Sequence, residues 1–170
     1  MRNAYDNAVL FTDWVLNELI GTLSAQHGVS WLYYVSDHGE NGAEATVLPW
    51  GHGSLTTEVL HVPLLVWLSP EYQSARPRQS AALRAHVNTP MSADNTFHTL
   101  LDMAGLTCAL TSPDRSVASP AFHQGPRVVI HMNDGLADYD KDVLPAEKAR
   151  SGTRHAQGAA RFQPASILPR

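Results

Sequence analysis

The chain has 170 residues, enough for one domain with a hydrophobic core. Its 44% hydrophobic and 16% charged residues are typical of a globular protein, and a formal net charge of −4 argues against a nucleic-acid-binding protein. The single cysteine, Cys108, excludes an internal disulfide framework. We find no signal peptide at Met1 and no apolar run near the roughly 18 residues of a transmembrane segment, so we expect the chain alone to be soluble.

An amphipathic helix is predicted over residues 3–26, because apolar residues recur at helical spacing while most polar residues fall elsewhere. His27 and Gly28 would end it as a glycine cap. A helix followed by a strand is half of a β–α–β unit whose first strand is missing, so we expect an incomplete domain. The apolar stripe consists of Tyr5, Ala8, Val9, Thr12, Val15, Leu16, Leu19, Ile20 and Leu23.

The central stretch is 31–40, where the apolar run 31–35 predicts a buried strand. Asp37 and His38 follow at its carboxyl end, where ligands bind in open α/β sheets. A carboxylate beside an imidazole suits a divalent ion, zinc first, and Gly39 would allow both side chains to point into one pocket. The alternative is an Asx turn at Asp37 with His38 as a solvated loop residue.

Residues 41–60 form a long glycine-rich segment without periodicity, and such loops are often functional. His52 lies between two glycines, so its imidazole could return toward the Asp-His pair, or it could be an exposed loop histidine. Glu40 and Glu44 are either carboxylates that hydrogen-bond to metal ligands or solvated loop charges. His61, before the next strand, is expected to be structural.

The remaining elements are predicted as strands at 62–68 and 127–131 and helices at 80–86 and from Ser92–Asn95 to Ala104, the last stopped by Gly105. The last helix would bury Phe97, Leu100, Leu101 and Ala104, with His98 on the opposite turn as a structural residue. Residues 143–170 are expected to be a disordered tail, since most of them mix small, polar and proline residues without apolar periodicity.

Four blocks then resemble, in order, the closing part of the phosphoethanolamine transferases. The blocks are YDNAVLFTDWVLNELIGTL (5–23), WLYYVSDHGE (31–40), HVPLLVWLSPEY (61–72) and SADNTFHTLLDMAGL (92–106). This family consists of zinc-dependent membrane enzymes of the alkaline phosphatase and sulfatase superfamily that modify lipopolysaccharide. The segment PDRSVASPAF (113–122) looks most like the branch that modifies the lipopolysaccharide core.

The resemblance implies an α/β fold, part of an alkaline-phosphatase-like three-layer sandwich with a mostly parallel sheet flanked by helices. Residues 1–142 would be the C-terminal portion of that catalytic domain. The full-length enzyme would carry phosphoethanolamine from phosphatidylethanolamine to lipopolysaccharide, either lipid A or core. It would sit in the inner membrane with its catalytic domain in the periplasm.

By the same resemblance Asp37 and His38 are two ligands of one zinc ion, and His52 binds the phosphoryl group of the substrate. The nucleophilic threonine, an acidic zinc ligand and the membrane helices of the family lie upstream of the matched segment. Thr46, Thr56 and Thr57 are not assigned as nucleophile. We therefore expect an incomplete zinc site and a chain that is inactive alone.

Two alternatives remain at this point. The first is another hydrolase of the superfamily, a sulfatase or a phosphatase. Sulfatases use a modified cysteine or serine in a C/S-x-P-x-R setting, which the sequence around Cys108 lacks. The second is a truncated remnant that binds no metal and is not an enzyme.

Overall fold

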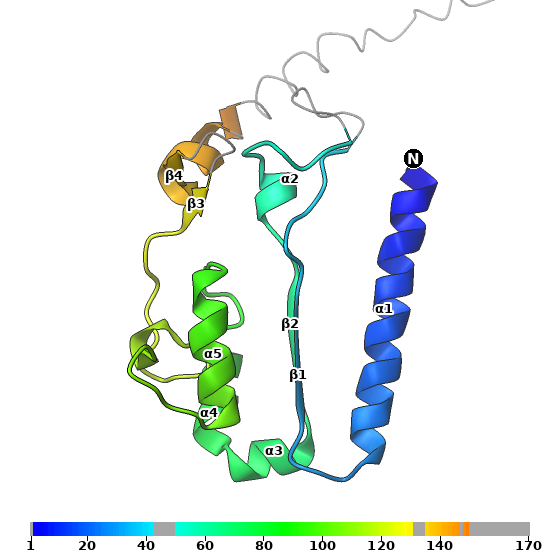
Figure 1. Ribbon diagram of the computed structural model, residues 1–170, viewed down its shortest axis with the longest axis vertical. Helices are drawn as coiled ribbons and strands as arrows, with labels where there is room; N and C mark the ends of the chain where they lie inside the picture. Colours follow the sequence, from blue (N-terminus) through cyan, green and yellow to red (C-terminus); the bar gives the residue numbers. More distant parts are fainter. Residues whose placement is uncertain (1, 43–49, 131–134, 147, 150–170) are drawn as a thin grey trace, which may run out of the picture.

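The computed structural model describes residues 2–42, 50–130, 135–146 and 148–149, and these form three layers (Figure 1). The central layer is a two-stranded sheet of β1 (Trp31–Val35) and β2 (Leu64–Leu68). Helix α1 (Arg2–Ala25) lies on one side of the sheet, and α4 (Pro77–Ala85) and α5 (Asp94–Ala104) lie on the other (Figure 1). The expected α/β class and the helix–sheet–helix order are therefore confirmed.

Shorter elements close the two ends of the sheet. Helix α2 (Thr57–Leu60) lies near the end where β1 finishes, and α3 (Pro70–Ala75) follows β2 at the opposite end (Figure 1). The chain then continues through the 3-10 turn η1 (Pro113–Arg115), the hairpin strands β3 (Val128–Ile130) and β4 (Leu136–Asp138), and the π-helical turn η2 (Tyr139–Val143).

The described strands pair antiparallel, which differs from the mostly parallel sheet we expected. Trp31 lies opposite Leu68 and Val35 opposite Leu64, and the β3–β4 pair is antiparallel too. A parallel pair needs a crossover of a dozen or more residues, usually a long helix on one face of the sheet. The described part of the connection between β1 and β2 holds only the four-residue α2, so the chain re-enters the sheet from the end at which it left.

The hydrophobic core fills the space between the sheet and the α3–α5 side. Strand side chains alternate between faces, and the antiparallel register puts Trp31, Tyr33, Val66 and Leu68 against the buried cluster. That cluster consists of Tyr72, Met103 and Ala118. The Tyr72 hydroxyl donates to Met103 O over 3.0 Å, which ties α3 to α5. Burial of this phenol raises its pKa.

The side of the sheet that α1 covers is more exposed to solvent than the sequence predicted. Helix α1 is confirmed, but Tyr5, Val9 and Leu19 of its predicted apolar stripe are 46%, 53% and 47% exposed. All five residues of β1 are half-buried, whereas we expected a buried strand. The physical reason is the narrow sheet: two strands leave their outer edges open and cover only part of the stripe on α1.

Helix α5 ends at Gly105 as predicted, with φ 72°, but its predicted buried face is wrong. Phe97 is 47% exposed, whereas His98 and Thr99 are 6% and 0% exposed. Residues 112–119 return over this polar face, where Ser112 N donates to His98 Nδ1 and Val117 N donates to Thr99 Oγ1. The loop supplies hydrogen bonds to these polar side chains, so burying them carries little cost in free energy. This packing is consistent with the structural role expected for His98.

The other predicted elements lie close to their expected places. Helix α4 begins at Pro77, three residues earlier than expected, and β3 falls within the predicted strand 127–131. The turn that ends α1 uses the left-handed region at His27 (φ 46°), not at Gly28 as predicted. Residues 144–146 are helical, and most of the predicted disordered tail lies outside the described residues. Glu44 and Thr46 also lie outside them.

Candidate metal centre

The loop that leaves β1 is fixed by hydrogen bonds to the segment before β2. Ser36 N donates to Pro63 O over 3.3 Å, and Gly39 N donates to Val59 O over 2.7 Å. A Cβ at position 39 would overlap the carbonyl oxygen of Glu58. Glycine is therefore required at this position by close backbone approach, which brings α2 directly under the loop.

Asp37 and His38 lie side by side at the carboxyl end of β1, as the sequence predicted. His38 Nε2 is 3.8 Å from Asp37 Oδ2, and the backbone N–H of His38 donates to Asp37 Oδ1 over 3.0 Å. This N–H bond, followed by the charge of the adjacent imidazole, lowers the pKa of the Asp37 carboxyl. The Asp37 side chain is 86% exposed, so it presents an ionised carboxylate to the surface.

The glycine-flanked loop carries His52 back to this pair. The His38 and His52 rings are stacked with centroids 4.0 Å apart, and His52 Nδ1 lies 2.8 Å from Glu40 Oε1. Trp50 has φ 57°, so the chain turns through the left-handed region just before Gly51. His52 therefore returns to the Asp-His pair, although its side chain remains 55% exposed.

Hydrogen bonds define the tautomer of both imidazoles. His38 Nδ1 lies 3.0 Å from Gly39 O, and His52 Nδ1 faces the Glu40 carboxylate. Carbonyl and ionised carboxylate oxygens only accept, so Nδ1 carries a proton in both rings, which in a neutral ring leaves the lone pair on Nε2. Histidine ligands are commonly held in this way, with one ring nitrogen donating to an oxygen and the other free for the metal.

A buried amide joins the two loops beneath these side chains. Asn41 is 1% exposed; its Nδ2 donates to Ser54 Oγ over 2.7 Å, and its Oδ1 accepts from Thr56 Oγ1 over 2.7 Å. Asn41 N also donates to Gly51 O over 3.0 Å. Asn41 is the functional neighbour that the sequence did not reveal, because its partners lie 13 and 15 residues away without a shared pattern.

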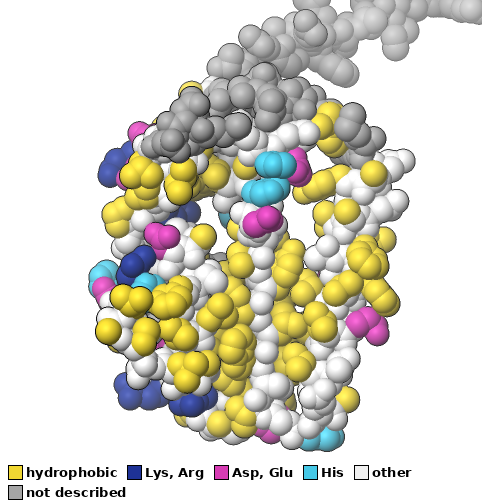
Figure 2. Space-filling model, viewed as in Figure 1, with side chains coloured by type: hydrophobic (Ala, Val, Ile, Leu, Met, Phe, Trp, Pro, Cys, Tyr) yellow, Lys and Arg dark blue, Asp and Glu magenta, His cyan; other side chains and the backbone are white. Residues whose placement is uncertain are grey.

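The resulting cluster has the donor set of a divalent metal site. Donor atoms of His38, Glu40 and His52 all lie within 4.8 Å of one another, and Asp37 Oδ2 lies outside this group but 3.8 Å from His38 Nε2. Two imidazoles and two carboxylates are zinc ligands, so these residues fit the ion. Figure 2 shows adjoining histidine side chains with acidic side chains beside them at the surface. Glu40 therefore belongs to the donor cluster, whereas the sequence also allowed it to be a solvated loop charge.

The remaining candidates lie outside this cluster. His61 is exposed and belongs to no metal-like group among the described residues. Thr56 is buried against Asn41, and Thr57 opens α2 after a loop, so neither has the setting of a nucleophile that follows a strand. Cys108 is a free, exposed thiol.

Comparison with known proteins decides the family. The sulfatase family model matches residues 1–106. The chain belongs to the sulfatase family. It is 36% identical to phosphoethanolamine transferase EptA of Salmonella typhimurium over 111 residues, which are 61% of this chain and 20% of EptA. It is 32% identical to phosphoethanolamine transferase EptC of Escherichia coli K12 over 146 residues, 84% of this chain and 25% of EptC. The predicted resemblance to phosphoethanolamine transferases is confirmed.

Solved structures agree with this assignment. The C-terminal periplasmic domain of E. coli EptC matches with a TM-score of 0.69 and 32% identity, over 81% of this chain and 39% of that domain. The same domain has been solved in complex with zinc, with the same TM-score. The chain thus spans about a quarter or less of the curated relatives described above. Within the described residues, no helix has both the length and the apolar character to cross a membrane.

Proposed function

We propose that this chain supplies the Asp37–His38 part of the metal centre of a phosphoethanolamine transferase. The observation that carries the proposal is the grouping of His38, Glu40 and His52 at the carboxyl end of β1, with Asp37 beside His38. Two of these residues, Asp37 and His38, are the predicted zinc ligands, and His52 is the predicted contact for the substrate phosphoryl group. The zinc complex of the EptC domain supports the choice of metal.

When bound, zinc would supply Lewis acidity toward a phosphoryl oxygen and lower the pKa of an attacking hydroxyl. The ionised Asp37 carboxylate and His38 Nε2 would hold the ion. His52 would place its Nε2 beside the transferring group, and Glu40 would keep its Nδ1 protonated. The loop fixed by Gly39 would hold these donors before substrate arrives, and such preorganisation is a main source of catalysis at polar sites.

We propose that the full enzyme transfers phosphoethanolamine from phosphatidylethanolamine to lipopolysaccharide at the periplasmic face of the inner membrane. The nucleophile, a further acidic ligand and the membrane anchor would come from the part of the enzyme that the relatives carry beyond the matched segment. We propose accordingly that residues 1–142 form the C-terminal portion of the catalytic domain and that this chain alone has no transferase activity.

Zinc titration by calorimetry tests the metal site directly. We expect saturable binding of one ion per chain, weakened at least tenfold by Asp37→Ala and by His38→Ala, because each change removes one ligand. His123→Ala is the matched control, since His123 is an exposed histidine whose Nε2 also lies near a carboxylate, 3.9 Å from Asp114 Oδ2. Zinc binding that neither substitution weakens, or no zinc binding at all, overturns the assignment of Asp37 and His38 as ligands.

The activity requires a second experiment in an EptC background. Residues 3–142 of this chain would replace the matching segment of E. coli EptC, and transfer from phosphatidylethanolamine would be measured. We expect the chimera to be active and its Asp37→Ala variant to be inactive. The sulfatase family match makes sulfate ester hydrolysis the second candidate. A folded chimera that hydrolyses a sulfate ester and transfers no phosphoethanolamine favours that candidate.

A further inference from the structure

The outer edge of β1 presents backbone groups that point away from β2. Ser69 N donates to Ser30 O over 3.0 Å, so this aligned pair shares a hydrogen bond between the strands. Hydrogen-bonded pairs alternate with non-bonded pairs in an antiparallel sheet, and positions 32 and 34 of β1 are therefore bonded to β2. The residues between them turn their N–H and C=O groups to the outer edge: Trp31, Tyr33 and Val35.

This edge of β1 is uncovered in the described part of the chain. Within those residues no other strand pairs with it, and no side chain bonds to its outward backbone groups. The edge of β2 differs, because Gln73 Nε2 donates to Leu68 O over 3.1 Å. Natural proteins commonly protect an exposed edge strand with a charged residue, a proline or a bulge. The sequence WLYYV of β1 contains no charge and no proline, so β1 has the composition of an internal strand.

Helix α1 adds exposed hydrophobic side chains to the same layer of the molecule. Leu10, Phe11 and Trp14 are 67%, 63% and 55% exposed, and the rings of Phe11 and Trp14 lie 5.7 Å apart. Figure 2 shows a column of backbone running down from the histidine and acidic side chains of the metal centre, with hydrophobic side chains on both sides and over α1. Contiguous exposed apolar groups mark interaction sites, whereas single ones are ordinary.

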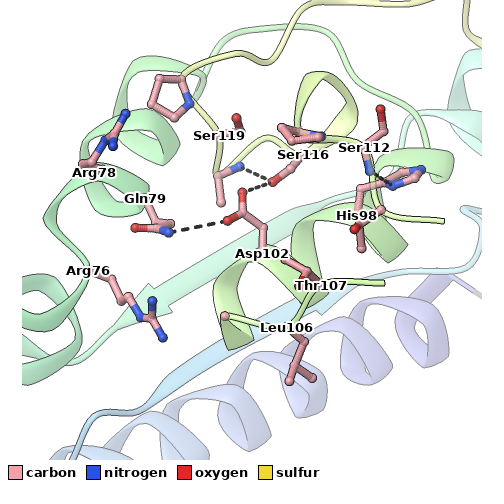
Figure 3. A pocket seen from close by; sticks show the side chains of 15 residues that line it. Arg76, Arg78, Gln79, His98, Asp102, Leu106, Thr107, Ser112, Ser116 and Ser119 are labelled. Atoms are coloured by element: carbon pink, nitrogen blue, oxygen red, sulfur yellow. Dashed lines mark hydrogen bonds between the residues drawn. The ribbon is translucent and has the colours of Figure 1, made fainter. Parts of the chain in front are cut away.

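The layer on the other side of the sheet meets its own polar requirements. Around the pocket between α4, α5 and the loop 111–120, Ser116 Oγ donates to Asp102 Oδ2 over 2.6 Å, and Ser112 N donates to His98 Nδ1 over 3.2 Å (Figure 3). The hydrophobic core lies between this layer and the sheet. The open surface to be explained is therefore the edge of β1 together with α1.

We infer that the β1 edge and the exposed side of α1 bind the complementary portion of a sulfatase-family catalytic domain, which adds a strand to β1. The structural match covers 81% of this chain but 39% of the EptC domain, so more than half of that domain is available to supply this strand. Backbone hydrogen bonds give strand addition its affinity, and apolar residues of the partner would cover α1. The inference rests on the proposed placement of 1–142 in a larger domain and does not require zinc.

Amide hydrogen exchange tests this edge residue by residue, in EDTA so that metal binding plays no part. In the full chain alone, the amides of Leu32 and Tyr34 should be protected by their bonds to β2. Those of Trp31, Tyr33 and Val35 should exchange at least tenfold faster. The chain is then co-expressed with the portion of the E. coli EptC domain that lies outside the structural match, and in this complex the three outward amides should slow at least tenfold.

A proline at the edge removes one outward donor without removing a bond between β1 and β2. Val35→Pro should therefore lower the amount of co-purified partner at least tenfold. Leu64→Pro is the matched control, because Leu64 is the aligned residue on β2 and its N–H points to the opposite edge. Circular dichroism shows whether each variant keeps its fold, and the exchange measurement on the parent chain does not depend on either variant.

Polar substitutions test the contribution of α1. Phe11→Ser/Trp14→Ser should weaken binding of the EptC portion at least tenfold. Val87→Ser/Leu110→Ser is the control, since both side chains are 75% exposed and lie outside α1, and it should bind as the parent does.

Several results would overturn the inference. The matching segment of EptC itself, co-expressed with the same portion, shows that this partner is competent to bind. Failure of this chain to bind that competent partner, a complex in which the outward amides stay fast, or equal binding by Val35→Pro contradicts strand addition. A homodimer that slows these amides without the partner would assign the edge to a second copy. The zinc titration is independent of these measurements, so failure of strand addition and failure of the metal site are distinguishable.

Discussion

His52 Nδ1 donates to Glu40 Oε1 over 2.8 Å, and this bond joins the loop after β1 to the loop that begins at Trp50. The two residues are 12 positions apart. Their contact holds the imidazole with a proton on Nδ1, and the ring stacks on His38 at a centroid distance of 4.0 Å. The geometry of the candidate site therefore depends on a carboxylate that the sequence left open as a solvated charge.

Removing this carboxylate should weaken metal binding. Glu40→Ala is expected to reduce zinc affinity about 10–100-fold, because it removes a carboxylate that neighbours the His38 ligand in the donor cluster. Calorimetric titration measures the change. Glu58→Ala removes an exposed carboxylate from the neighbouring α2 and serves as control. Equal losses in both variants would mean that general negative charge, and not the position of Glu40 in the cluster, governs zinc affinity.

Gly39→Ala should destabilise the protein, because the new methyl group would overlap the carbonyl oxygen of Glu58. We expect the free energy of unfolding to fall by about 1–3 kcal/mol, as for other overpacked positions. Gly21→Ala is the matched control: it lies in α1 with nothing within 4 Å of the added atom. The control should gain about 0.5–1 kcal/mol of helix stability. Denaturant unfolding of both variants measures the effects, and a neutral Gly39→Ala would refute the close approach.

Asn41→Ala should separate the two loops of the site. It leaves the hydroxyls of Ser54 and Thr56 without their present partner and should cost about 1–3 kcal/mol of unfolding free energy. It should also lower zinc affinity, since the loop that carries Asp37 and His38 loses an anchor. The exposed Asn88 provides the control substitution. An Asn41→Ala variant as stable as Asn88→Ala would show that the amide does not hold the loops together.

Acid should weaken the closure of the β3–β4 hairpin at its base. Arg127 Nε donates to Asp140 Oδ2 over 3.0 Å, and this pair lowers the pKa of the Asp140 carboxyl from its ordinary value of 3.8. A carboxyl with a lowered folded-state pKa stabilises the fold above its ordinary pKa, and the contribution disappears as pH falls through the folded-state value.

Thermal unfolding from pH 6 down to pH 2 measures this dependence. Asp140→Asn should be less stable than the parent at pH 6, and the difference should shrink below the ordinary pKa of 3.8. Asp6→Asn removes a charge that forms no ion pair with any residue in the described ranges, and it should give a curve parallel to that of the parent. A difference that stays constant across the whole range would contradict the role assigned to the Arg127–Asp140 pair.

The elements with strong local signals were predictable from the sequence. Periodicity located α1, the apolar runs located β1 and β2, and Gly105 marked the end of α5. The side-by-side placement of Asp37 and His38 follows from adjacency at the end of a strand, so the sequence alone could give it.

What the sequence could not give depends on distant partners. The antiparallel pairing of β1 and β2 is set by how the intervening chain returns, and no local residue specifies it. The buried face of α5 was misjudged because the loop near Ser112 supplies hydrogen bonds to His98, which makes a polar face the buried one. Glu40 and Asn41 gain their roles only when the loop at His52 is brought beside them.

Anomalous diffraction at the zinc edge, from crystals of this chain soaked with zinc, tests the central claim most directly. We predict a peak about 2.0–2.2 Å from an Asp37 carboxylate oxygen and from His38 Nε2, the usual range for zinc with oxygen and nitrogen ligands. A zinc peak at other histidines would contradict the assignment of these two residues as metal ligands. The absence of any peak, although the chain in solution is saturated with zinc, would contradict it too.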